Sequence, residues 1–205
     1  MSHHPTDVID HLVGTLPGSP LDRVRQHRAT ARANAQQSYL ALFAPETPGR
    51  FSLADRFALA TFVASLHRQP AIAAFYADGL PLAAVIGQVA TRGLTKGPYG
   101  RFPAGPLSTE DEDGLNFSLD ETERSALGKA LAAAFEHAHL LVFHPRDARP
   151  EHLQALLDAG WSTTEIVTLS QLVAFLSFQI RVVVGLRALA ASPAPLVSNT
   201  AEAQA

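Results

Sequence analysis

Apolar residues between Trp161 and Ala190 form the longest helical pattern in the chain, and they fall on nearly every side of that helix. Ser162 is placed as its N-cap, and Glu165 three residues later completes a capping box. A helix that is apolar all round is buried in a core or an interface, or it spans a membrane. The pattern therefore predicts one long helix around which the rest of the chain is organised.

Polar residues inside this segment argue against a membrane span. Gln171, Gln179 and Arg181 interrupt the apolar run, and a charged side chain at the centre of a bilayer costs about 3 kcal/mol. We therefore interpret the segment as the central helix of a soluble helical protein, and we expect no membrane partner.

The rest of the chain predicts further helices and no β-sheet. No segment shows sustained alternation of apolar and polar residues with a period of two. Helix-starting residues and apolar positions predict a short helical turn or two before residue 18, and then helices at 19–43, 53–67, 70–79, 82–91, 117–139 and 149–159. The predicted fold class is all-α, a helical bundle of about eight helices.

Loops and local composition divide the chain into five parts. In order, these are an N-terminal segment (1–18), a first helical half (19–91), a long connecting loop (92–116), a second helical half (117–190) and a tail that we expect to be disordered (191–205). A loop as long as this connector, in a compact protein, is usually functional or an interaction arm.

The two halves resemble each other in sequence. When Ser52 is placed over Ser162, Asp55 matches Glu165. Four further positions are identical in the two copies: Leu59 and Leu169, Val63 and Val173, Ala64 and Ala174, Leu66 and Leu176. The match predicts two related helical halves that bury their apolar faces against one another, with the two aligned helices packed as central elements.

Composition and charge narrow the function. The 205-residue chain has a net charge of −3 at pH 7, and it contains no cysteine. This charge disfavours nucleic acid as a partner. The basic residues at 23–32 have no aromatic residues among them, so we interpret them as a solvated face or a subunit contact. The N-terminus lacks the apolar stretch of a signal peptide, and we expect a cytoplasmic protein.

Two segments of the second half carry a resemblance to a known family: LLDAGWSTTEI at 156–166 and AFLSFQIRV at 174–182. Over roughly residues 43–189 the chain resembles the alkylhydroperoxidase-D-like, carboxymuconolactone-decarboxylase superfamily, and within it the two-half "peroxidase-related" branch. Two Asn positions of that branch's helix-end pattern hold Ser177 and Ile180 here. The resemblance implies an all-helical, generally oligomeric protein with a role in peroxide reduction or antioxidant defence.

The family's peroxidase site lacks its reactive residues in this chain. The resemblance implies an acid near a helix start, a Cys-x-x-Cys pair about three turns on, and a His four residues later. Asp55 and Glu165 fall at the acid positions. His67 (Arg68, if the register slips by one) and Ser177 fall at the first thiol positions. A peroxide-reducing thiolate needs sulfur, so we expect no thiol peroxidase activity.

The candidate site residues of the first half lie on the aligned helix and just beyond it. Asp55 and His67 are candidates for acid–base catalysis, although residues twelve apart on a straight helix lie about 18 Å apart. Arg68 and Tyr76 are candidate substrate contacts. The alternatives are a satisfied polar residue at a helix end for His67, and a core residue with a hydrogen-bonded hydroxyl for Tyr76.

The second half adds a row of small residues that ends in a cation. Ser170, Ala174, Ser177 and Arg181 follow i, i+4, i+7, i+11 spacing and so share one helix face. A guanidinium in this setting needs a carboxylate or carbonyl partner. We interpret the row as a packing seam closed by a structural ion pair, with substrate binding by Arg181 as the alternative.

The sequence predicts no metal and no cofactor. No two of the nine histidines have the i, i+3 or i, i+4 spacing of a helical metal site. Glu136 and His139 form one Glu-x-x-His pair, whereas a di-metal bundle needs two. Neither a Gly-rich phosphate loop nor a Gly-x-Ser-x-Gly elbow is present.

Two functional hypotheses follow. The protein is either an enzyme that uses acid–base chemistry without a thiol on a small substrate, or a catalytically degenerate oligomeric module that binds a small molecule or a protein partner. For the first, the resemblance supplies a precedent, since decarboxylation of a lactone acid needs no cysteine. We expect a homo-oligomer, dimeric or trimer-based, because the last helix and the Ala-rich 31–43 segment together present more apolar surface than one small core needs.

Overall fold

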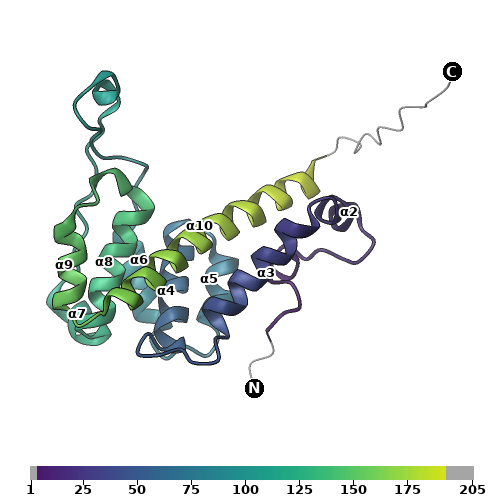
Figure 1. Cartoon of the computed structure of the whole chain (residues 1–205), viewed down its shortest axis with the longest axis horizontal. Helices are drawn as coiled ribbons and strands as arrows, with labels where there is room; N and C mark the ends of the chain where they lie inside the picture. The colour runs from purple at the N-terminus through teal and green to yellow at the C-terminus, as the bar shows by residue number, and fades with distance from the viewer. Residues whose placement is uncertain (1–3, 193–205) are drawn as a thin grey trace.

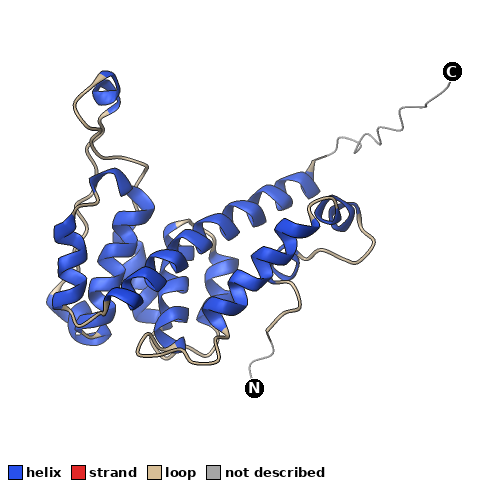
Figure 2. Cartoon of the chain, in the orientation of Figure 1, coloured by secondary structure: helices blue, strands red, loops and turns tan. Residues whose placement is uncertain are grey.

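A computed structural model describes residues 4–192, and within that range the chain forms α-helices, two short 3-10 helices and no β-strand (Figures 1 and 2). The elements are α1 (Val8–Val13), α2 (Pro20–Gln26), α3 (Ala29–Phe43), α4 (Leu53–Leu66), α5 (Pro70–Ala77), α6 (Ala83–Gly93), η1 (Pro106–Glu110), α7 (Glu121–Leu127), α8 (Lys129–Phe143), η2 (Pro145–Asp147), α9 (Pro150–Asp158) and α10 (Thr163–Ala191). The all-α prediction is confirmed, with ten α-helices in the described range rather than about eight. Most of the predicted tail, 193–205, lies outside the described residues.

Two of the predicted helices are each broken into two. The helix predicted at 19–43 divides into α2 and α3 around His27 and Arg28. The helix predicted at 117–139 becomes α7 and α8, which meet at a bend of 114°. Gly128 forms that bend with a φ of 77°, a left-handed conformation that favours glycine. The first of these two helices begins at Glu121, after the N-cap Asp120, rather than at residue 117.

The centre of the core is α4 rather than α10. Every residue of α4 from Ala58 to Ala64 is buried, and α5, α6, α8 and α10 all pack around it. The core of one chain does not bury α10 on all sides, because Val167 and Phe178 are 51% and 46% exposed; burial of these residues in an interface stays a prediction. At 29 residues α10 is about 44 Å long. In Figure 1 its C-terminal half extends past α4 along α3 toward α2.

Among residues 4–192, α10 is the one single helix long and apolar enough to cross a membrane by length and composition; α7 and α8 qualify only when joined across their bend. In the most apolar 18-residue stretch of α10, 39% is buried in this structure. The core helix of a soluble protein meets the same criterion, and we retain the interpretation of α10 as a packing helix.

The two helices aligned in sequence lie side by side and run in the same direction. At their N-terminal ends the rings of Phe51 and Trp161 meet edge to face, with centroids 4.9 Å apart. Twelve residues beyond the aligned acids, His67 at the end of α4 lies beside Ser177 of α10. Both pairs join positions that the sequence alignment equates, so matched residues face each other along the contact.

The 92–116 connector forms an arm that projects from the bundle, with η1 at its tip (teal in Figure 1). Its two branches are joined by backbone hydrogen bonds between Gly100 and Glu112. The base of the arm is held to the end of α8, where the N–H of Tyr99 donates to the carbonyl of Phe143 at 2.9 Å. This attachment places Gly97 and Pro98 beside α8, where they form one wall of a cleft.

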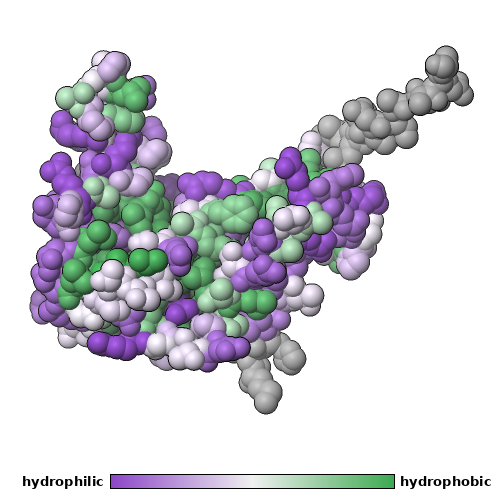
Figure 3. All heavy atoms as spheres, viewed as in Figure 1, coloured by the Kyte–Doolittle hydropathy of each residue, from purple (hydrophilic) through white to green (hydrophobic). Residues whose placement is uncertain are grey.

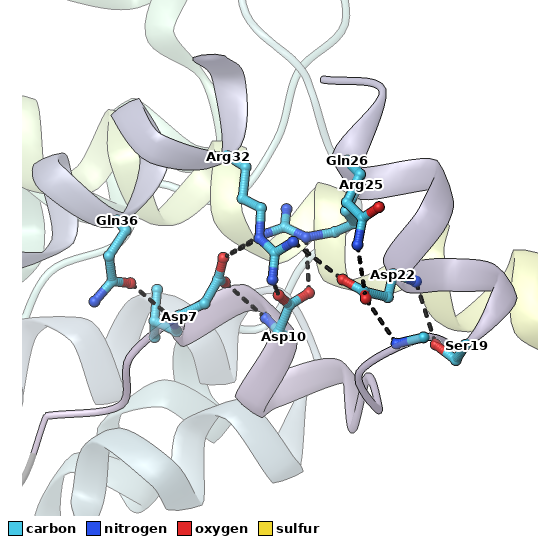
Figure 4. A network of polar contacts seen from close by, with 10 residues as sticks. Asp7, Asp10, Ser19, Asp22, Arg25, Gln26, Arg32 and Gln36 are labelled. Carbon is cyan, nitrogen blue, oxygen red and sulfur yellow. Dashed lines mark hydrogen bonds and ion pairs between the residues drawn. The ribbon is translucent and has the colours of Figure 1, made fainter. Parts of the chain in front are cut away.

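Buried ion pairs hold α1, α2 and α3 together (Figure 4). Arg25, only 8% exposed, pairs with Asp7 at 2.6 Å and with Asp10 at 2.7 Å. Arg32 of α3 contacts the same two carboxylates and also Asp22. The interpretation of the basic residues as a solvated face or a subunit contact is therefore wrong for Arg25 and Arg32, because acids of their own chain neutralise them.

The pKa of Asp7 shows the balance within this network. Burial raises the pKa, but the N–H of Asp10 and the guanidinium groups of Arg32 and Arg25 outweigh burial, and the pKa lies below its ordinary value. Asp7 is therefore ionised at neutral pH.

We predict that Arg25→Ala destabilises the protein by about 3–5 kcal/mol, because it leaves Asp7 and Asp10 buried with only the more exposed Arg32 as a partner. Urea unfolding at pH 7.5 measures the change. Arg28→Ala is the control: Arg28 is exposed and makes no capping bond, so its effect should stay within about 0.5 kcal/mol. Equal effects of the two substitutions would contradict the structural role of the network.

Candidate functional site

A cleft of about 530 Å³ lies where the end of α4, the end of α8 and the middle of α10 meet. All four members of the small-residue row on α10 line it, and so does His67. The opposite wall is mainly apolar and consists of Gly97, Pro98, Leu141, Val142, Phe143 and Pro145, and α10 itself adds the apolar Val173. The cleft therefore combines one cation, one imidazole and two hydroxyls with a largely apolar surface.

His67 lies at the C-cap of α4 and is partly buried. Burial, and secondarily the positive charge of Arg181, lower its pKa to about 4. Its Nε2 lies 3.5 Å from Ser177 Oγ, at the outer limit of a hydrogen bond. The imidazole is therefore neutral at pH 7, and its position leaves it able to accept or donate one hydrogen bond in the cleft.

Arg181 does not close the seam with an ion pair. One of its guanidinium nitrogens donates to the carbonyl of Ser177 at 2.8 Å, and no ion pair of Arg181 with a carboxylate occurs among residues 4–192. The Ser177 carbonyl is thus the partner that we expected for this guanidinium. The interpretation of a seam closed by a structural ion pair is wrong, and Arg181 lines a cleft instead.

Asp55 lies away from this cleft. It lines a separate pocket of about 250 Å³ between the N-terminal ends of α4 and α10, together with Glu165. There Ser52 donates its hydroxyl to the Asp55 carboxylate at 2.7 Å, and Ser162 donates to Glu165 at 2.8 Å. Both acids thus serve helix capping. The structure does not bring Asp55 and His67 together, because the straight helix α4 separates them.

The two candidate substrate contacts of the first half lie outside the cleft. Tyr76 is fully buried and donates its hydroxyl to Gln179 at 2.5 Å, which matches the core role that we held as its alternative. Burial raises its pKa well above the ordinary value. Arg68 is exposed just after α4, with a φ of 57°, and it does not line the cleft.

The two members of the Glu-x-x-His pair have separate structural partners. His139 is fully buried, stacks on Phe117 with centroids 4.4 Å apart, and bonds through Nε2 to the carbonyl of Gly93. Glu136, the acid of the Glu-x-x-His pair, instead binds the guanidinium of Arg124. In the described range no group of three or more His, Cys, Asp or Glu side chains is placed to hold a metal ion.

Sequence reasoning missed half of the cleft. Leu141, Val142 and Phe143 read in sequence as the end of an ordinary helix, and Gly97 and Pro98 as loop residues. Nothing in their local pattern indicates that the arm folds back beside α8. The packing of α8 against α10 and the contact of Tyr99 with Phe143 bring these two segments to the cleft.

Comparison with protein-family models, with curated proteins and with solved structures found no match to this chain. The function must therefore be argued from the cleft.

We predict that the protein loses stability on acidification between about pH 6.5 and pH 4. Burial lowers the pKa of both His137 and His139 to about 4, against about 6.5 in an unfolded chain. In this window the unfolded state binds more protons than the folded state, so stability is complete above pH 6.5 and falls toward pH 4. The slope is about 1.4 kcal/mol per pH unit for each histidine.

Urea unfolding at pH 7.5, 6.0 and 5.0 measures this slope. His137→Leu should reduce this slope by the contribution of one histidine, about 1.4 kcal/mol per pH unit. The reason is that His137 is 6% exposed and its Nδ1 has no partner among residues 4–192. An unchanged slope in the variant would show that another group titrates.

Proposed function

We propose that this protein is a small-molecule-binding protein whose ligand occupies the cleft between α4, α8 and α10. The observation that carries the proposal is the convergence of His67, Ser177 and Arg181, from two helices 110 positions apart, on one cavity of about 530 Å³. Ligand pockets commonly enclose about 300–1,000 Å³, with apolar walls and a few convergent polar groups. The resemblance to the alkylhydroperoxidase-D-like superfamily supports the same location, because His67 and Ser177 occupy its thiol positions.

Acid–base catalysis at His67 is a second candidate function. The observation that favours it is the Ser177 hydroxyl 3.5 Å from His67 Nε2, the arrangement of a nucleophile beside a base. It ranks second for two reasons. No carboxylate of the described part of the chain lines the cleft to orient the imidazole, and a pKa near 4 makes His67 a weak base at neutral pH.

We predict that Ala174→Leu abolishes ligand binding without unfolding the protein. Ala174 is an exposed helical residue that lines the cleft, so a leucine there fills the cavity and leaves the core intact. In a thermal-shift screen of small molecules, a ligand at ten times its Kd adds about 1.4 kcal/mol and raises Tm by about 3–6 °C.

Hits on the wild-type protein should give no shift with Ala174→Leu. They should still shift Ala188→Leu, which adds the same side chain to an exposed position of α10 outside the cleft. Hits that survive Ala174→Leu would place the ligand elsewhere and overturn the proposal.

We also propose that copies of the chain associate through the exposed side of α10. Val167, Phe178 and Leu189 recur every eleven residues, or three helical turns, and are 51%, 46% and 38% exposed. Figure 3 shows hydrophobic atoms along α10 on this face of the molecule. A row of apolar side chains of this kind on a single helix is suited to the equivalent helix of a second copy.

Sedimentation at micromolar concentration should therefore show a species larger than the 21.9 kDa chain. Phe178→Gln should shift the distribution toward monomer, because it removes the apolar side chain at the middle of the row. Leu107→Gln, which changes an equally exposed leucine on the arm, should leave it unchanged. A wild-type protein that sediments only as monomer would end this proposal.

A further inference from the structure

The charge of the cleft indicates what kind of ligand it takes. Among residues 4–192, Arg181 is the only permanently charged residue that lines it, and no Asp or Glu does. His67 adds no second charge, since burial keeps it neutral at pH 7. A cavity with a single positive charge and no negative one attracts an anion and disfavours a cation.

The donors of the cleft are concentrated on the same side chain. Ser170 donates its hydroxyl to the carbonyl of Ile166 on its own helix at 2.9 Å, and the Ser177 hydroxyl lies beside His67. Arg181 carries five N–H donors, of which its one hydrogen bond in the described chain, to the Ser177 carbonyl, uses one. The planar guanidinium can therefore present a pair of parallel N–H groups, and a carboxylate accepts such a pair through both oxygens.

The remaining surface determines the other end of the ligand. Leu141, Val142, Phe143 and Val173 offer apolar contacts and no hydrogen-bond donor from their side chains. A second anionic group on the ligand would have no second cation to meet, and burying an unpaired charge against this wall is costly. The cleft thus suits a molecule with one anionic end and an apolar body.

We propose that the ligand is a monocarboxylic acid with an apolar body. Its carboxylate binds Arg181, and its body lies against the C-terminal end of α8 and the base of the arm. This inference rests on the proposed small-molecule function of the same cleft. It assigns Arg181 as the residue that selects the charge of the ligand, and it assigns Leu141, Val142 and Phe143 as the residues that accept its apolar part.

Isothermal titration at pH 7.5 with octanoate and octan-1-ol tests the assignment, because the two probes share the apolar chain and differ in charge. Octanoate should bind the wild-type protein about tenfold or more tightly than octan-1-ol. Arg181→Gln should lower the affinity for octanoate to that for octan-1-ol, and it should leave the affinity for octan-1-ol unchanged. Arg181→Lys keeps the charge but not the paired donors, and it should fall between the two. Arg28→Gln, an exposed arginine outside the cleft, is the matched control.

The outcomes separate the two proposals. Equal affinity for both probes, or octanoate binding that survives Arg181→Gln while Ala174→Leu abolishes it, overturns the carboxylate assignment and leaves the cleft as a binding site. Binding that Ala174→Leu leaves intact overturns both. Failure of octanoate to bind overturns the carboxylate assignment alone, since the thermal-shift screen judges the cleft independently. Circular dichroism of each variant confirms that the helical fold is retained.

Discussion

The parallel contact between α4 and α10 is the constraint on which the rest of the structure depends. Two helices that start side by side, each capped by a serine and an acid, place equivalent residues opposite one another: Phe51 meets Trp161 at one end, and His67 meets Ser177 at the other. The contact buries the apolar face of each helix and fixes two cavities, one at each end of the pair. Asp55 and Glu165 line one cavity, and His67 and Arg181 line the other. The two candidate catalytic residues of the first half, Asp55 and His67, are therefore separated.

Two buried arginines elsewhere in the molecule find partners within the chain. Arg56, 5% exposed, donates to the carbonyls of Leu42, Pro48 and Phe51 and so ties the loop after α3 to the start of α4. Burial lowers its pKa, and carbonyl oxygens supply the hydrogen bonds that water would otherwise make. Arg25 is matched by aspartates in the same way. Arg181 differs from both, because it bonds to one carbonyl and lines a cavity. It therefore keeps hydrogen-bond donors available to a ligand in the cleft.

The residues that line the cleft determine its chemistry. What the described side chains can do there is bind an anion, exchange one hydrogen bond with a neutral imidazole, and pack an apolar group. These properties favour binding over catalysis. The small-residue row from Ser170 to Arg181 lines the surface that a ligand would occupy.

The sequence by itself determined the starts and caps of α4 and α10, because Ser52, Ser162 and Glu165 act through neighbours three residues away. It also determined the face shared by Ser170, Ala174, Ser177 and Arg181, since helical periodicity alone sets that face. Only the tertiary structure decided that α4 is the central helix, that Arg25 and Arg32 are neutralised by acids of the N-terminal segment, and that Phe143 and Pro98 complete the cleft. These features depend on contacts between residues far apart in the chain, and local patterns carry no information about which distant residues will meet.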